Sequence, residues 1–203
     1  MRMSEQYKVA DFLPEGSEGP WLVQRFAVSE ADEQFGRLRA AISSCRGRYV
    51  PAGIYTRLLH GETMIMSDTP DEVRDHIELI VKAKGRVLLH GLGLGMVARA
   101  ALLKPEVEHV TIIEKAPEVV KLVGEPLIAR FGAERTAVIT DDAFTWKPPK
   151  GVRWDVVWHD IWPTLCSDNL PEMAQLHRRF GHRAGWQGSW GRSWCEMYRK
   201  ERG

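Results

Sequence analysis

Four short apolar segments, separated by stretches of helical character, constrain the fold of this chain more than any other feature. They are RVLLH (86–90), HVTIIE (109–114), TAVIT (136–140) and DVVWH (155–159). Strands that are apolar almost throughout are typical of parallel sheets, which are covered on both faces. Helices are predicted between them near 95–104, 116–131 and 142–146. This alternation predicts an α/β fold with a mostly parallel sheet and right-handed connections.

The residues before these segments predict a different kind of structure. WLVQRFAV (21–28) is a candidate strand, and Ser29, three residues before Asp32, is a helix N-cap signal for a helix over 29–44. Residues 52–68 predict a β-hairpin that turns at His60-Gly61-Glu62. We therefore expect residues 1–68 to form an N-terminal segment of strand, helix and β-hairpin that packs on the core.

The core is expected to span residues 69–163, starting with a helix over 70–83. The N-cap of this helix would be Thr69, with Pro70 in the first turn. The apolar face of the helix would carry Val73, Ile77, Ile80 and Val81. Residues 164–203 form an extension rich in Trp and Arg in which no strong strand is predicted. Trp186, Trp190 and Trp194 would share one face only if that segment were helical, and its glycines disfavour a helix.

A four-stranded sheet of this kind leaves an exposed parallel edge after the fourth strand. Only about 43 residues follow, too few for three more strands with their helices at usual lengths. Since an exposed edge invites aggregation, we expect the N-terminal segment, the Trp-rich tail or a second subunit to cover it. We also expect a homo-oligomer.

A glycine-rich turn, Gly91-Leu-Gly93-Leu-Gly95, follows the first of these strands and leads into a helix. Such a turn lets the backbone approach a ligand closely. A phosphate-binding P-loop is excluded, because Gly95 is followed by Met96 rather than by Lys and Ser or Thr. A dinucleotide fingerprint also fits poorly, because it would require a small residue at position 96.

Acidic residues follow the next three strands of the predicted sheet. Glu114 closes the second strand, Asp141-Asp142-Ala143 follows the third, and Asp160 follows the fourth. The carboxyl ends of parallel strands meet at one edge of the sheet, where ligands bind at the switch point. The sequence therefore predicts a binding crevice at this edge.

The pattern G-x-G-x-G resembles motif I of the class I S-adenosylmethionine-dependent methyltransferases. Residues 52–163 resemble the spermidine synthase-like branch of that family, and the runs GETMIMSDTP and HDIWP are similar to runs in small phage proteins. The resemblance implies a Rossmann-like sheet, shortened at its C-terminal end, that binds S-adenosylmethionine as cofactor. The residues it assigns to the cofactor are Gly91, Gly93, Gly95, Glu114, Lys115, Asp142 and Ala143.

The same resemblance places Asp160 at the reaction centre, where it would orient or deprotonate an amine; alternatively it only caps the following loop. His76, His159 and Trp162 are the candidates for the acceptor pocket. Aminopropyltransferases carry a glutamine where Met64 stands and a Tyr-His pair where Asp75-His76 stands, so polyamine chemistry is disfavoured. The prediction is a methyltransferase of unknown acceptor. A non-catalytic S-adenosylmethionine-binding module or subunit, or an aminopropyltransferase, is the alternative.

Composition excludes several other classes. With 28 Lys and Arg against 27 Asp and Glu, bulk charge does not attract polyanions, although the basic stretch 175–203 leaves nucleic acid as a less favoured partner. The three cysteines form no CxxC pair, and the histidines lack metal-ligand spacing, so no metal site is predicted. No apolar run approaches the roughly 18 residues of a membrane span, and we expect a cytoplasmic protein.

Overall fold

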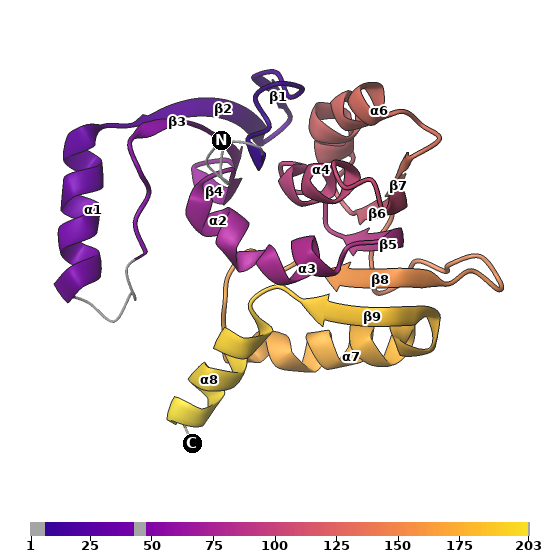
Figure 1. Ribbon diagram of the computed structural model, residues 1–203. Coiled ribbons are helices and arrows are strands. Elements are labelled where there is room, and N and C mark those ends of the chain that lie inside the picture. Colours follow the sequence, from indigo (N-terminus) through magenta and orange to yellow (C-terminus); the bar gives the residue numbers. More distant parts are fainter. Residues whose placement is uncertain (1–6, 43–47, 203) are drawn as a thin grey trace.

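The computed structural model describes residues 7–42 and 48–202, which form two sheets joined by a pair of short helices (Figure 1). The N-terminal sheet is antiparallel, with the order β1-β2-β3-β4. Its strands are β1 (Gly16–Glu18), β2 (Trp21–Val28), β3 (Gly53–His60) and β4 (Thr63–Ser67). The predicted strand over 21–28 and the predicted hairpin are thus confirmed.

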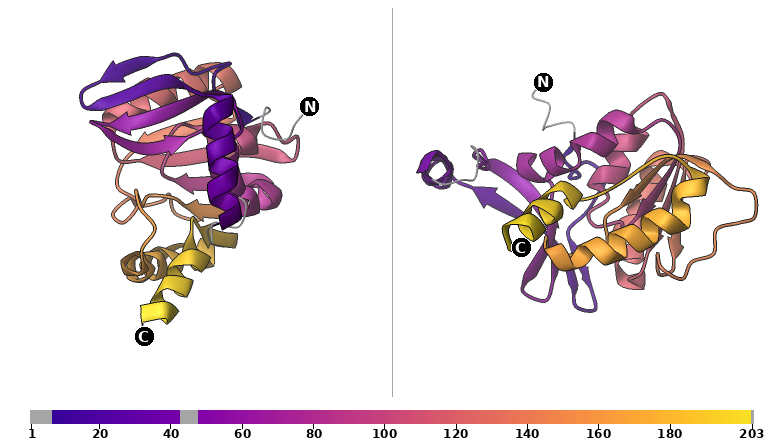
Figure 2. Two further views of the ribbon diagram at one scale, coloured as in Figure 1. Left: turned by 90° about the vertical axis from the view of Figure 1, so that its left-hand side faces the viewer. Right: turned by 90° about the horizontal axis from the view of Figure 1, so that it is seen from below.

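Helix α1 (Glu30–Ile42) connects β2 to β3 and lies at the edge of the molecule, away from the second sheet (Figures 1 and 2). Its start follows the predicted cap, because the Asp32 amide donates to Ser29 Oγ at 3.1 Å and the Ser29 amide donates to Asp32 Oδ2 at 2.9 Å. Residues 43 and 44, the end of the predicted helix, lie outside the described residues.

The single helix predicted over 70–83 is wrong, because the chain breaks at His76 into α2 (Pro70–Asp75) and α3 (Ile77–Lys82). His76 has φ −103° and ψ 5°, and its side chain is fully buried. This break turns α3 so that Leu79 and Ile80 face the core. Val81, expected on the apolar face, is 69% exposed, and Ile77 is 36% exposed.

The second sheet is the predicted α/β core, a Rossmann-like parallel sheet with the order β7-β6-β5-β8-β9. The four predicted strands are β5 (Gly85–His90), β6 (Val107–Glu114), β7 (Thr136–Thr140) and β8 (Trp154–His159). The helices between them are α4 (Met96–Leu102), α5 (Pro117–Val119), the π-helical turn η2 (Val120–Gly124) and α6 (Glu125–Phe131).

Residues 142–146 do not form the predicted helix. They form a turn in which the Asp142 carbonyl accepts hydrogen bonds from the amides of Thr145, at 3.0 Å, and Trp146, at 2.7 Å. The Asp142 side chain accepts the Phe144 amide at 2.7 Å. A carboxylate that bonds backbone two residues ahead favours such a turn over a continued helix.

The C-terminal extension contains a strand that the sequence did not predict. Strand β9 (Ala184–Ser189) pairs in parallel with β8, so the tail itself covers the edge of β8. Trp186 lies on β9, Trp190 follows it and Trp194 lies on the last helix, so the three do not share a helical face. The other elements of this region are η3 (Ser167–Asn169), α7 (Leu170–Phe180), η4 (Gly181–Arg183) and α8 (Arg192–Arg202).

Alternate residues of the core strands pack on opposite faces of the sheet. Val87 and Leu89 of β5 join a core formed with α3, α4 and α6, and Leu88 packs with α7 and Trp146 on the other face. Both faces are thus covered, as expected for apolar parallel strands. Among the described residues, no helix is long and apolar enough to cross a membrane.

Candidate functional site

A cavity of about 730 Å³ lies at the carboxyl ends of β5, β6, β7 and β8, where the sequence predicted a binding crevice. Its volume is within the roughly 300–1,000 Å³ typical of small-molecule sites. Most of the predicted site residues line it: Gly91, Gly93, Glu114, Lys115, Asp142, Ala143, Asp160 and Trp162. Gly95, His76 and His159 are not among the lining residues.

The glycine turn has the geometry of a close backbone approach. Gly91 has φ 95°, and a Cβ atom there would lie 2.0 Å from the Asp160 carbonyl oxygen. Gly93 has φ 52°, and its Cβ would lie 2.5 Å from the sulfur of Met66. A larger residue at position 91 would therefore separate the turn from the end of β8, and one at position 93 would displace the Met66 side chain. Gly95 is the N-cap residue of α4 and faces Val123, which does not line the cavity.

Glu114 ties the end of β6 to the glycine turn. Its Oε2 accepts the Leu92 amide at 2.8 Å, and its Oε1 accepts the Ala116 amide at 2.9 Å. Each carboxylate oxygen has a further lone pair, so the group can still accept hydrogen bonds from a ligand in the cavity. The two backbone bonds fix the position of the carboxylate before a ligand arrives.

The end of β7 contributes a second acidic group at the rim of the cavity. The Asp142 Oδ2 lies 3.5 Å from the ammonium of Lys115, whose side chain is 82% exposed. Ala143 is buried and leaves room beside this pair. The arrangement offers a planar ligand an apolar floor and a carboxylate acceptor at its edge.

Asp160, at the end of β8, combines burial with a charged neighbour. Its carboxylate lies 3.6 Å from Nε2 of His76, and Glu72 lies 3.9 Å from the same nitrogen. Burial raises the pKa of Asp160 to about 6, an effect that His76 opposes. Burial alone would lower the pKa of His76, but the carboxylates of Asp160 and Glu72 outweigh it, and the pKa is raised. At neutral pH, an ionised Asp160 therefore lies beside His76, whose raised pKa favours its cationic form, just behind the cavity wall.

His159 lies in the core rather than in the cavity. Its Nδ1 is 2.7 Å from Nδ1 of His90, and the two residues are opposite each other in the register of β5 and β8. One ring must donate and the other must accept, so the two rings cannot both be cationic. Burial, with the charge of Arg179, lowers the pKa of His90 to about 3. Burial likewise lowers the pKa of His159. Sequence reasoning missed this pair, although the strand alignment could have revealed it.

The N-terminal sheet forms the opposite wall of the cavity, which sequence reasoning also missed. Trp21 and His60, with ring centroids 4.7 Å apart, line it from β2 and β3. Met66 of β4 reaches the glycine turn, where its sulfur lies 3.4 Å from the Leu94 amide nitrogen. Met64, the position compared with the family's glutamine, is 55% exposed and is not a lining residue.

Residues that follow β8, including two from the C-terminal extension, complete the wall next to Asp160. Trp162 donates through Nε1 to Glu172 Oε2 at 2.7 Å, which fixes the indole at the cavity. Trp190 also lines the cavity, and its ring stacks at 6.4 Å on the ring of His76. The cavity is thus bounded by residues from all three segments of the chain.

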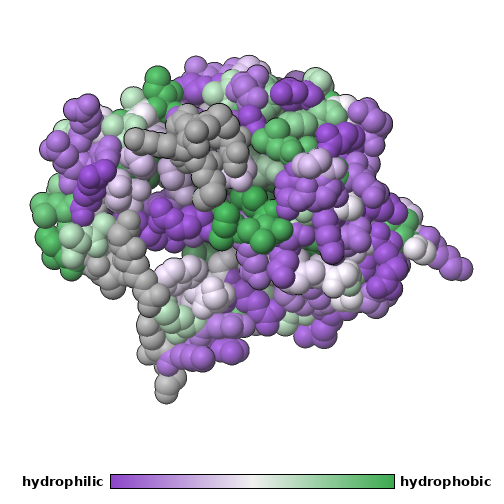
Figure 3. Space-filling view, viewed as in Figure 1, coloured by the Kyte–Doolittle hydropathy of each residue, from purple (hydrophilic) through white to green (hydrophobic). Residues whose placement is uncertain are grey.

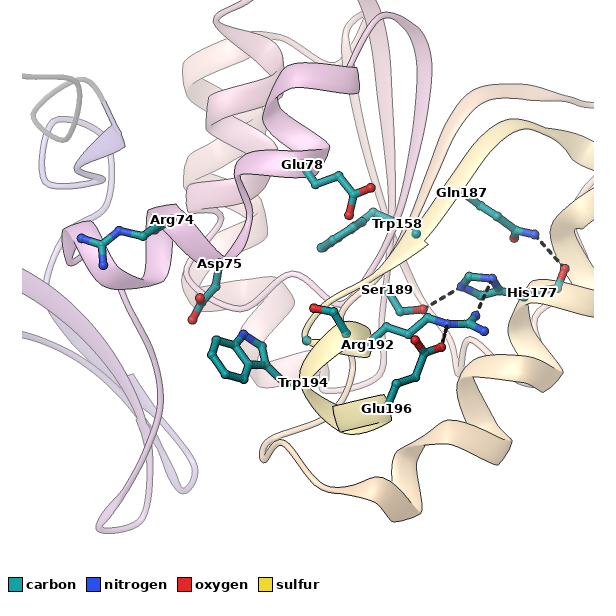
Figure 4. Close-up of a pocket in the computed structure, with 13 residues that line it drawn as sticks. Arg74, Asp75, Glu78, Trp158, His177, Gln187, Ser189, Arg192, Trp194 and Glu196 are labelled. Carbon is teal, nitrogen blue, oxygen red and sulfur yellow. Dashed lines mark hydrogen bonds and ion pairs between the residues drawn. The ribbon is translucent and has the colours of Figure 1, made fainter. Parts of the chain in front are cut away.

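A second cavity, of about 470 Å³, lies between α2, α3, β9 and α8 (Figure 4). In it, His177 Nε2 lies 2.8 Å from Ser189 Oγ, and Arg192 donates to His177 Nδ1 at 3.1 Å. Because the guanidinium only donates, Nδ1 must accept and Nε2 must carry the proton. His177 therefore donates to Ser189 and cannot accept its proton, so the pair is not a nucleophile and its base.

Among the described residues, no group of three or more His, Cys, Asp or Glu side chains could hold a metal ion. Cys166 and Cys195 are free thiols, and Cys45 lies outside the part of the chain that is described.

No protein-family model matches the sequence, and no curated protein matches it. Among solved structures, the chain is similar to a dimethyladenosine transferase from Plasmodium falciparum, with 23% identity over 46% of this chain and 32% of that chain and a TM-score of 0.37. It is also similar to a methyltransferase from Streptomyces caelestis, with 19% identity, 54% and 44% coverage and a TM-score of 0.43. A candidate RNA methyltransferase from Pyrococcus horikoshii shows 19% identity, 58% and 59% coverage and a TM-score of 0.44. The matched part spans between about a third and three fifths of those proteins.

Proposed function

We propose that the protein is an S-adenosylmethionine-dependent methyltransferase that acts on a small acceptor bearing an amine. One observation carries this proposal: the glycine turn, Glu114, Asp142 and Asp160 converge on one cavity of ligand size at the carboxyl ends of four parallel strands. Ligands of α/β proteins bind at this edge.

The donor and acceptor groups present fit a nucleoside with an amino acid tail. Glu114, held by two backbone amides, can accept hydrogen bonds from the two ribose hydroxyls. Asp142, beside buried Ala143, can accept from an adenine amino group, with Lys115 at the rim. Gly91 and Gly93 leave the backbone of the turn open to the methionine portion.

The acceptor class follows from the charges of the cavity. Among the described residues, the cavity is lined by six carboxylates and by a single ammonium group, that of Lys115. This excess of negative charge would repel an acceptor that carries a phosphate. Three indoles lie among the same lining residues, and indole faces attract cations. The carboxylates are those of Glu72, Glu114, Asp141, Asp142, Asp160 and Glu172, and the indoles are those of Trp21, Trp162 and Trp190.

The bound cofactor would supply a methyl group already activated by its sulfonium. The chain must then align the acceptor, exclude water and accept a proton. Asp160, ionised at neutral pH, can orient an amine and take its proton. His76 holds that carboxylate from behind, and Trp162 and Trp190 shield the reaction centre from water.

The same acidic, Trp-lined wall also suits a polyamine, and this favours an aminopropyltransferase as the second candidate. The two reactions use different nucleosides, one with and one without the methionine carboxylate. Calorimetric titration with S-adenosylmethionine, its demethylated product and decarboxylated S-adenosylmethionine therefore separates them. Micromolar binding of the first two supports the methyltransferase, and preference for the decarboxylated form supports the alternative.

Two variants connect binding and turnover to the named residues. Glu114→Ala is expected to weaken nucleoside affinity by about 1 to 3 kcal/mol, because charge-assisted hydrogen bonds are lost. The matched control is Glu108→Ala, which removes an exposed carboxylate from the other end of β6. Asp160→Asn is expected to abolish methyl transfer to amines while nucleoside affinity is retained. Binding without turnover on any amine would instead indicate a non-catalytic module.

A further inference from the structure

Helix α1 carries an apolar stripe that its own chain leaves exposed. Phe35 is 64% exposed, Leu38 59% and Ile42 79%, and Ala31 is exposed as well. The spacings of four, three and four residues between these positions are those of a helix seam that packs against another helix. Figure 3 shows apolar surface over α1 at the left edge of the molecule.

The opposite face of α1 is fixed to the rest of the N-terminal segment. Ala40 is buried, Gly36 faces Tyr49, and Glu33 Oε2 accepts the Ala52 amide at 2.7 Å. These contacts hold the helix in one orientation, with the apolar stripe turned away from the molecule. An exposed stripe on a fixed helix indicates an interaction surface.

The charges along α1 are complementary to a second α1 that runs in the opposite direction. The first turn carries Glu30, Asp32 and Glu33, and the second half carries Arg37 and Arg39. Asp32 and Arg39 are exposed, one residue beyond Ala31 and Leu38 of the stripe. An antiparallel pair brings Asp32 of each helix beside Arg39 of the other, whereas a parallel pair would bring like charges together.

We propose that a second copy of this chain covers the stripe, with the two α1 helices packed antiparallel about a two-fold axis. A two-fold axis uses the same surface on both subunits, and the charge pattern of α1 satisfies this condition with itself. A 13-residue helix is about 20 Å long. A pair of such helices buries less than the roughly 800 Å² per partner of standard stable interfaces, so we expect a micromolar, concentration-dependent dimer.

Sedimentation velocity of the full chain, from about 1 to 200 μM, tests the dimer. We expect wild type to shift from monomer to dimer across this range, and Leu38→Glu to raise the dissociation constant at least about tenfold by placing a charge in the seam. Val81→Glu is the matched control, because Val81 is an exposed apolar residue on α3, outside the stripe. Far-UV circular dichroism checks that each variant stays folded. A wild type that is monomeric throughout, or a dimer that Leu38→Glu leaves unchanged, would overturn the proposal.

Salt dependence tests the antiparallel arrangement separately. Wild-type dimerisation should weaken with added salt, because salt screens the attraction between Asp32 and Arg39 of the two chains. Arg39→Glu should weaken the dimer at low salt, and salt should then strengthen it by screening repulsion. A dimer that Arg39→Glu strengthens, or that responds to salt identically in both proteins, would overturn the antiparallel pairing. These outcomes do not depend on the proposed enzymatic function.

Discussion

Replacing Asp160 by asparagine is expected to stabilise the fold at pH 8, although the same change should abolish methyl transfer. Burial raises the pKa of this carboxyl from 3.8 to about 6. Between these pH values, the folded protein holds a proton that the unfolded chain has released. The contribution of Asp160 to the free energy of unfolding therefore falls as the pH rises through this window and stays low above it. Asparagine keeps the shape of the neutral carboxyl and carries no charge.

The size of the gain follows from the same pKa change. A rise of the Asp160 pKa from 3.8 to about 6 corresponds to about 3 kcal/mol in the free energy of unfolding. The attraction of His76, whose Nε2 lies 3.6 Å from the carboxylate, already opposes this shift and is contained in the figure. We therefore expect the free energy of unfolding of Asp160→Asn to be about 3 kcal/mol higher than that of wild type at pH 8, and within about 0.5 kcal/mol of it at pH 4.

Urea denaturation followed by tryptophan fluorescence at these two pH values measures the difference. Asp141→Asn is the control, because Asp141 is an exposed acid at the rim of the same cavity, and it should stay within about 0.5 kcal/mol of wild type. A variant at Asp160 that is less stable than wild type at pH 8, or equally stabilised at both pH values, would refute the reasoning. The Asp160 carboxylate would then stabilise the fold by capping the loop that follows it.

Three further predictions concern the turn, the buried histidines and the reaction. Gly91→Ala should destabilise the protein by about 3 kcal/mol or more in denaturation, because its Cβ would overlap the Asp160 carbonyl. The control is Gly151→Ala, because Gly151 also has a positive φ, 81°, but a Cβ atom there would have no neighbour within 4 Å. This control should lose about 1 kcal/mol of stability, and an equal loss in both variants would contradict the overlap at Gly91. His90 and His159 should not titrate between pH 5 and 8 in proton NMR, and a chemical-shift midpoint there would contradict their neutral pair. The rate of methyl transfer should rise with pH through about 6, as Asp160 ionises, and a flat profile would exclude its role as a base.

The parallel sheet and its acidic edge could be predicted because the signals are local. Each core strand is a run of apolar residues, and the residue after a parallel strand must lie at the ligand-binding edge. Glu114, Asp142 and Asp160 therefore meet in space although 46 residues separate the first from the last. Strand β9 gave no such signal, because AGWQGS contains two glycines and no apolar run, and only its pairing with β8 makes it a strand.

Tertiary contacts explain the other differences between the features predicted from the sequence and those of the structure. The helix predicted over 70–83 breaks because His76 is drawn into the core beside Asp160. His159, adjacent to Asp160 in sequence, points to the opposite face of the sheet because side chains alternate along a strand, and it meets His90 there. The wall formed by Trp21 and Met66 depends on how two sheets pack, which no local pattern specifies.

Met66 contacts the glycine turn at the boundary between two sides of the cavity. The two sides come from different stretches of the sequence. Residues 91–144 provide the side with Glu114 and Asp142, whereas residues 21–72 and 160–190 provide the facing wall. Sequence change in the N-terminal sheet therefore alters the shape of the wall without disturbing the strand ends that hold the carboxylates. A chimera that exchanged only the hairpin would retain one half of the cavity while acquiring a new opposite half. The fold thus allows the facing wall of the cavity to diversify independently of the acidic strand ends.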